Sequence, residues 1–156
     1  MRIIPLAFVL DLTDKEIADV SAITHAHSKS MYGCIAYIRI ARGLLQRRKL
    51  KECILEYVSE DSAYARVRGI EEVARENILS SGYVVDTFEA AMWCLLTTDS
   101  YKECILKAVN LGDDTDTVGA VAGGLAGIMY GYDNIPKEWI EGLKSKEVIE
   151  NCLFDT

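Results

Sequence analysis

Apolar side chains recur every three or four residues along most of this chain, which is the spacing of one face of an α-helix. The first such run includes Ile17 and Ile23 and follows Thr13 and Glu16, whose spacing is that of a helix-opening capping box. A second run covers Met31–Leu45. The pattern therefore predicts two helices in the first third of the chain.

Further stretches with helical character follow. They cover Leu50–Val58, Ile70–Leu79, Phe88–Leu96, Ile105–Val109, Val118–Tyr130 and Trp139–Leu143. Two of these stretches are preceded or opened by capping-box spacing, Asp86 with Glu89 and Ser100 with Glu103. For Glu89, a capping role is therefore a better interpretation than a role as a catalytic acid.

Glycine and proline mark expected helix ends. Gly112 lies where a helix C-cap is expected, and Pro136 at a first helical position. Little of the chain has the pattern of a strand. The stretch IIPLAFVL at residues 3–10 is the best candidate, but periodicity does not distinguish it from a buried helix. We therefore expect a single all-α domain over residues 1–156, built as a helical bundle.

The composition is that of an ordinary globular protein, and its net negative charge disfavours some classes of binding partner. Half of the 156 residues are hydrophobic, and the formal net charge is −7. An acidic chain repels phosphates, so we expect neither nucleic acid nor an anionic membrane as a partner. The short basic run at residues 47–51 is best explained as the solvated end of a helix. No apolar stretch is long enough to cross a bilayer.

The cysteines give no framework for a disulfide or a zinc site. There are five of them, an odd number, and no pair has CxxC spacing. Several lie in apolar helical patterns, where a thiol packs as a small hydrophobic group. The first ten residues lack the cleavage site of a signal peptide. These features fit a reducing cytoplasm.

The segment GDDTDTVGAVAGGLAGIMYG at residues 112–131 carries the clearest chemistry. Its helical part contains Gly119, Gly123, Gly124 and Gly127, each of which weakens an isolated helix by about 1 kcal/mol relative to alanine. Such a helix is stable only when its neighbours pack closely against it. We therefore expect a central helix whose N-terminus lies at the floor of a cleft.

Three carboxylates precede that helix within four residues, namely Asp113, Asp114 and Asp116. Clustered carboxylates repel one another, and either proton uptake or a hard cation such as Mg²⁺ or Ca²⁺ relieves this. Asp114 and Asp116 alternate with Thr115 and Thr117, which can aim two carboxylates and a hydroxyl at one point. From the residue types alone, a simple helix cap explains the segment better, since Asp and Thr are favoured there. Five residues cannot supply six oxygen ligands alone.

The stretch from Ser81 to Leu143 resembles the C-terminal part of the ADP-ribosylglycohydrolases, a family that includes the dinitrogenase-reductase-activating glycohydrolases. The resemblance includes SGYVVDT, EAAMW, AVNLGDDTDT, the Gly/Ala helix and IPKEW in this order. Upstream, Ile23, Thr24 and His25 resemble a Thr-His element of the family, and MRIIPLAF resembles the segment that follows its Gly-rich loop.

The resemblance implies an all-α bundle with a two-magnesium site in a central cleft. It implies that Asp114, Asp116 and Thr117 are metal ligands and that His25 lies near a bound ADP-ribose. It does not assign Asp113 as a ligand, because many family members have Gly at this position. The implied activity is Mg²⁺-dependent hydrolysis of an ADP-ribosyl N- or O-glycosidic bond, in an ADP-ribosylated protein or an ADP-ribose-type small molecule. Tyr83 follows a glycine and could border the nucleotide, although packing explains it about as well.

The sequence also departs from the family pattern. The family has a second acidic metal motif of the Thr-Asp-Asp kind and a Gly-rich loop, and neither occurs here. We therefore expect only the C-terminal half of the fold, half of the metal ligands, and weak metal binding and catalysis unless an N-terminal segment complements the chain. The alternative is a non-catalytic remnant that binds a partner or associates with itself as a homo-oligomer.

Other candidate chemistry is weaker. His25 and His27 form an HxH pair, but residues two apart on a helix do not face the same way. His27 is expected to be an ordinary surface or cap residue. The serines, cysteines and histidines form no recognisable nucleophile–base arrangement, so no catalytic residue is assigned.

Overall fold

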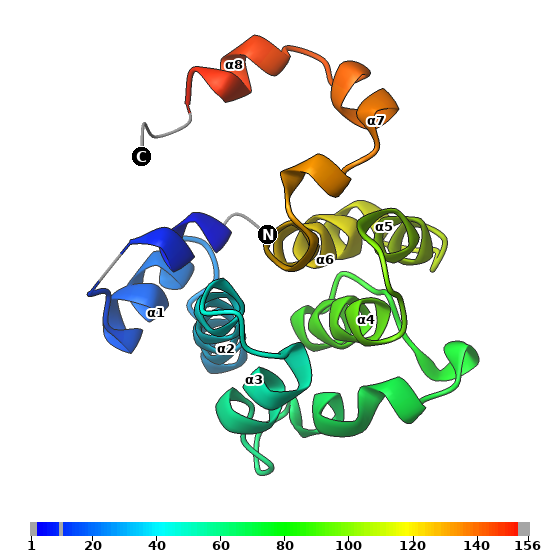
Figure 1. Cartoon of the computed structure of the whole chain (residues 1–156). Coiled ribbons are helices and arrows are strands. Elements are labelled where there is room, and N and C mark those ends of the chain that lie inside the picture. The colour runs from blue at the N-terminus through cyan, green and yellow to red at the C-terminus, as the bar shows by residue number, and fades with distance from the viewer. Residues whose placement is uncertain (1–2, 10, 153–156) are drawn as a thin grey trace.

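The computed structural model describes residues 3–9 and 11–152, and these ranges contain helices and turns but no strand. The elements are η1 (Ile4–Phe8), α1 (Asp14–Ala22), α2 (Ser28–Leu45), α3 (Leu50–Tyr57), η2 (Ala65–Glu72), η3 (Arg75–Asn77), α4 (Val84–Leu96), α5 (Tyr101–Val109), α6 (Thr115–Tyr130), η4 (Tyr132–Asn134), α7 (Lys137–Glu141) and α8 (Lys146–Glu150) (Figure 1). The predicted all-α fold class is confirmed.

The core forms where α4 and α6 lie together. All of α4 between Thr87 and Leu95 is buried, because this helix packs against α6, α5, α2 and η2. α6 packs against α5, α4 and α2 (Figure 1). The prediction that thiols pack as small apolar groups holds for Cys53, Cys94 and Cys104, which are all buried. No helix within the described ranges is both long enough and apolar enough to cross a membrane.

The predicted helix caps are only partly correct. Thr13 and Glu16 form the expected reciprocal capping box at the start of α1. The side chain of Ser100 accepts the backbone N–H of Glu103, as expected for the start of α5. The predicted surface or cap role of His27 is confirmed, because it is the N-cap of α2 and its Nδ1 accepts the backbone N–H of Lys29.

The predicted capping box of Asp86 and Glu89 is wrong. α4 begins at Val84, so both residues lie inside the helix. The carboxylate of Asp86 instead accepts the hydroxyl of Ser81 at 2.6 Å. Glu89 is buried and forms an ion pair with Arg66 at 2.8 Å. The spacing was misleading because Val84 and Val85, which precede Asp86, already belong to the same helix.

Three other predictions need correction. The region predicted as a helix over Ile70–Leu79 forms the short 3-10 turns η2 and η3 instead. The strand alternative for residues 3–10 is wrong over residues 4–8, which form η1, while residue 10 lies outside the described ranges. The helix ends predicted at Gly112 and Pro136 differ slightly from the observed ones. α5 is capped by Asn110, with Gly112 at φ +95° in the following turn, and Pro136 is the N-cap of α7.

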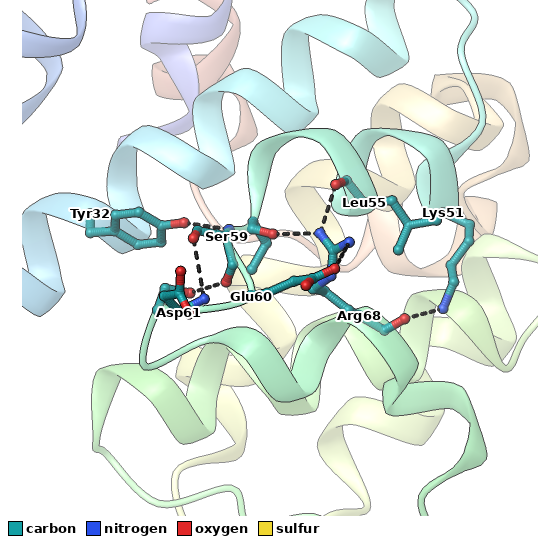
Figure 2. Close-up of polar contacts among 9 residues, drawn as sticks. Tyr32, Lys51, Leu55, Ser59, Glu60, Asp61 and Arg68 are labelled. Carbon is teal, nitrogen blue, oxygen red and sulfur yellow. Dashed lines mark hydrogen bonds and ion pairs between the residues drawn. The ribbon is translucent and has the colours of Figure 1, made fainter.

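The loop after α3 is held by an arginine that caps that helix. Arg68 Nη1 donates to the carbonyl oxygens of Leu55 and Val58 at 2.7 and 2.8 Å, and Nη2 contacts Glu60 at 2.8 Å (Figure 2). The hydroxyl of Tyr32 accepts the backbone N–H of Ser59 in the same loop. The two bonds from Arg68 Nη1 satisfy carbonyl groups that the end of α3 leaves without helical partners.

Tyr64, which belongs to the same loop, lies in the core beside α2. Tyr64 is fully buried, stacks on Tyr32 at 5.6 Å between ring centroids, and meets Phe88 edge-on at 5.1 Å. Its hydroxyl donates to the carbonyl oxygen of Lys29 at 2.9 Å. A Cβ at Gly33 would come within 2.4 Å of that hydroxyl, so only glycine fits there. Tyr64 thereby fixes the first turn of α2.

The N-terminal segment η1 is tied to α2 by Arg42. Its guanidinium donates to the carbonyl oxygens of Leu6, Val9 and Leu12 at 3.4, 2.9 and 3.2 Å. At the other end of the chain, α7 and α8 extend away from the bundle (Figure 1). Both lack buried residues.

Candidate functional site

The start of α6 holds Asp114 in a fixed position. Its backbone N–H donates to the carbonyl oxygen of Ser80 at 3.0 Å. Its carboxylate accepts the hydroxyl of Thr117 at 2.7 Å. Asp114 occupies the N-cap position, yet its side chain makes no capping bond to the backbone. This arrangement argues against the interpretation of Asp114 as only a helix cap.

The two neighbouring aspartates are more exposed. Asp116 lies in the first turn of α6, and the described residues provide it with no hydrogen bond or ion pair. Asp113 is exposed and adopts a left-handed conformation with φ +54°. The positive end of the α6 dipole favours both charges, which lessens their mutual repulsion.

The turn before α4 lies directly against the start of α6. The hydroxyl of Ser80 donates to the carbonyl oxygen of Gly112 at 2.8 Å. Gly82 is so close that a Cβ there would lie 3.3 Å from Asp114 Oδ2. Ser81 accepts the backbone N–H of Tyr83 at 3.1 Å while it donates to Asp86. The two segments of the SGYVVDT and GDDTDT motifs therefore form one surface.

Tyr83 extends this surface toward α2. It is the N-cap residue of α4 and is 47% exposed, so part of its ring is accessible to a ligand. Lys29 Nζ donates to its hydroxyl at 2.8 Å across 54 residues of sequence. Lys29 lies in the first turn of α2, so the N-termini of α2, α4 and α6 converge.

His25 lies in the loop that leads into α2. It is exposed, and its Nδ1 lies 2.9 Å from the hydroxyl of Thr24. No described contact joins it to Asp114 or Tyr83, so the structure brings Asp114, Thr117 and Tyr83 into one surface and leaves His25 at its side.

The electrostatics of this surface suit a cation bound together with an anion. Three helix N-termini present unpaired N–H groups and positive dipole ends, and Lys29 adds a charge. Within the described ranges no three His, Cys, Asp or Glu side chains gather closely enough to hold a metal ion. Two carboxylates and one hydroxyl are nevertheless hard oxygen donors that fit Mg²⁺, which usually keeps several water ligands.

Sequence reasoning missed Lys29 and Ser80, and it did not assign a role to Gly82. Lys29 gave no signal, because nothing in the sequence relates it to a tyrosine 54 positions away. Ser80 precedes the recognised motif SGYVVDT and Gly82 lies within it. Both fit closely against the backbone and side chain of Asp114, and only the fold reveals this contact.

The model of a known protein family, described as ADP-ribosylglycohydrolase, matches residues 1–155. The chain belongs to this family. The resemblance predicted from its motifs is therefore confirmed. A solved structure titled ADP-ribosylglycohydrolase-related protein complex shares the fold, with a TM-score of 0.82 and 29% identity over 95% of this chain.

Two curated relatives are similar over shorter regions. ADP-ribosylarginine hydrolase Tri1 of Serratia proteamaculans is 54% identical over 80 residues, which are 51% of this chain and 22% of that protein. ADP-ribosyl-[dinitrogen reductase] glycohydrolase of Rhodospirillum rubrum is 35% identical over 129 residues, or 80% of this chain and 41% of that protein. The chain thus spans less than half of these relatives, and 54% of the solved family member.

Proposed function

We propose that this chain supplies one half of a magnesium site in an enzyme that hydrolyses an ADP-ribosyl N- or O-glycosidic bond. The observation that carries the proposal is the placement of Asp114. Its carboxylate is held by Thr117 and lies beside Gly82, where the starts of α4 and α6 meet. Family membership gives this surface its chemistry, since the matching family model is that of glycohydrolases.

In this proposal Asp114, Asp116 and Thr117 hold Mg²⁺. When bound, the ion would orient the ribose hydroxyls and act as a Lewis acid. An octahedral shell has more positions than these three side chains can fill, so water or other ligands must occupy the rest. We therefore propose that metal binding by this chain alone is weak and that full activity needs the rest of the family fold.

The chain's own residues would position the ADP-ribose. Tyr83 offers an exposed aromatic ring beside Gly82, which suits contact with a base or ribose. We propose that His25 approaches the ligand from the loop before α2, where its ring is accessible. Lys29 and the helix N-termini would favour the pyrophosphate. No residue of the chain is assigned as a general acid or base.

The substrate class follows from the relatives' names. One is named as a hydrolase of ADP-ribosylarginine and another as a glycohydrolase of ADP-ribosylated dinitrogen reductase. We propose an ADP-ribosylated protein, or a related ADP-ribose-type small molecule, as the substrate here.

A second candidate is a non-catalytic module that binds a partner. The lack of a three-residue acidic, cysteine or histidine cluster in the described part of the chain favours it. Under this alternative the carboxylates of α6 serve only the helix start.

A calorimetric titration with Mg²⁺ in the presence of ADP-ribose tests the proposal. We expect binding by the natural chain and its loss in the double variant Asp114→Ala, Asp116→Ala. The matched control is Asp113→Asn, which removes a neighbouring exposed charge at a left-handed position that asparagine tolerates. Equal binding by all three proteins, or none by the natural chain, would favour the non-catalytic module.

A further inference from the structure

Ser80 is a buried polar residue that bonds the turn before α6 at two points. It is only 3% exposed. Its hydroxyl donates to the carbonyl oxygen of Gly112 at 2.8 Å, and its own carbonyl oxygen accepts the backbone N–H of Asp114 at 3.0 Å. Because these two groups lie on either side of Asp113, Ser80 holds the chain immediately before and after that residue.

The turn between these two bonds has a backbone conformation that side chains rarely adopt. Gly112 has φ +95° and Asp113 has φ +54°, so two consecutive residues lie in the left-handed region. Aspartate visits this region more readily than most residues, but the conformation still costs free energy. A strained turn persists only where its surroundings hold it. The contacts that hold this one come from the segment at residues 75–80, which we call the brace.

The brace is bonded to the core as well as to the turn. The guanidinium of Arg66 donates to the carbonyl oxygen of Asn77 at 2.7 Å and forms the ion pair with the buried Glu89 of α4. Arg75 Nη2 donates to the carbonyl oxygen of Leu111, which directly precedes the turn. The brace therefore connects a buried carboxylate of α4 to the chain that leads into α6.

We propose that Ser80 is a positioning residue for the carboxylate of Asp114. It holds the turn in its left-handed conformation, so that this carboxylate lies beside Gly82 before any ligand binds. The inference rests on the proposed function and deepens it, because Asp114 is a proposed metal ligand. A carboxylate whose direction is set in advance loses less conformational entropy when it binds a cation. Ser80 acts through Asp114 and does so by way of the backbone.

Ser80→Ala removes the hydroxyl bond and keeps the backbone carbonyl, so it tests this role directly. Backbone amide hydrogen exchange at Asp114 is measured without Mg²⁺ or ADP-ribose, and Mg²⁺ affinity is measured by calorimetry with ADP-ribose present. Loss of one hydrogen bond should make exchange at Asp114 about fivefold faster and Mg²⁺ binding about fivefold weaker. Arg75→Met, which removes the bond to Leu111, should change both quantities in the same direction.

The matched control is Ser100→Ala at the start of α5. The hydroxyl of Ser100 also bonds the backbone, since it accepts the N–H of Glu103 at 3.2 Å, but it lies at the end of α5 opposite the acidic turn. Thermal unfolding compares the stability of the variants. Ser100→Ala should lower stability through the lost helix cap and leave both exchange at Asp114 and Mg²⁺ affinity unchanged.

Three results would overturn the proposal. One is unchanged exchange at Asp114 in both Ser80→Ala and Arg75→Met. Another is faster exchange in Ser80→Ala with the Mg²⁺ affinity of the natural chain. The third is an equal loss of affinity in Ser100→Ala, because a general loss of stability would then explain the effect. If the natural chain binds no Mg²⁺, the proposed function fails, whereas faster exchange in metal-free Ser80→Ala would still support the positioning of Asp114 by Ser80.

Discussion

The position of Asp114 depends on contacts made by residues from two parts of the chain. Thr117 fixes one carboxylate oxygen, and Ser80 accepts the backbone N–H. Asp116 has only the helix start around it. The start of α6 therefore has one carboxylate that is held by a hydrogen bond and a second, exposed carboxylate on the same turn.

Glu89 is a buried carboxyl group whose ionisation should govern part of the pH dependence of stability. Burial raises its pKa, and Arg66 offsets this only in part. The folded state then holds the proton more tightly than the unfolded state. The contribution of Glu89 to stability is therefore present below its unfolded pKa, about 4.3, and is lost as pH rises through the folded pKa.

Replacing Glu89 by Gln removes this titration. We expect the natural protein to lose stability relative to Glu89→Gln as pH rises from about 4 to about 7. Urea unfolding at both pH values measures the difference. A variant that instead becomes relatively less stable at the higher pH would mean that the ion pair with Arg66 outweighs burial.

Arg42 should matter more to stability than its neighbour on the same helix. It bonds three carbonyl oxygens around η1, whereas Arg39 makes an ion pair with Asp14 in which both side chains are 45% exposed. Arg42→Met should lower the free energy of unfolding by about 1.5–3 kcal/mol. The control, Arg39→Met, should cost less than about 1 kcal/mol. Equal losses in urea unfolding would contradict this account.

At the scale of elements, α6 combines a functional start with a packing surface made of small residues. Its contacts with α5 and α2 depend on Gly123 and Gly124. The hydroxyl of Tyr37 donates to the carbonyl oxygen of Val121 at 2.8 Å and fills the space beside Gly124. The first half of α6 is thereby locked to α2, while the face at Gly127 stays open.

Two alanine substitutions in α6 should therefore have opposite effects. Gly124→Ala places a methyl group against the buried Tyr37 hydroxyl and should destabilise the fold by about 1–3 kcal/mol. Gly127→Ala meets no described atom and should stabilise it by about 1 kcal/mol. Thermal unfolding of both variants tests the contrast, and effects of the same sign would refute it.

Across the whole molecule, the sequence was most informative where one local signal decides the structure. The Thr13–Glu16 box and the apolar faces of α2 and α4 predicted helices that form. Local signals failed at residues 70–79, where tertiary packing holds 3-10 turns, and at Glu89, where burial and Arg66 override a capping pattern.

The site shows the same division. The motif at residues 112–117 was recognisable because its residue types are unusual together. Its connection to Ser80 was not recognisable, and neither was the contact of Lys29 with Tyr83. These contacts cross 34 and 54 residues and depend on how the helices meet. The close packing expected around the glycines of α6 is present, since this helix lies against α5, α4 and α2.

We propose that the starts of α2, α4 and α6 form one ligand surface. Backbone amide NMR spectra of the chain, recorded with ADP-ribose and increasing Mg²⁺, test it most directly. We expect shifts at Lys29, Gly82, Tyr83, Asp116 and Thr117, and none at Gly127 in the second half of α6. Shifts confined to one of these segments, or none at saturating ligand, would contradict the claim.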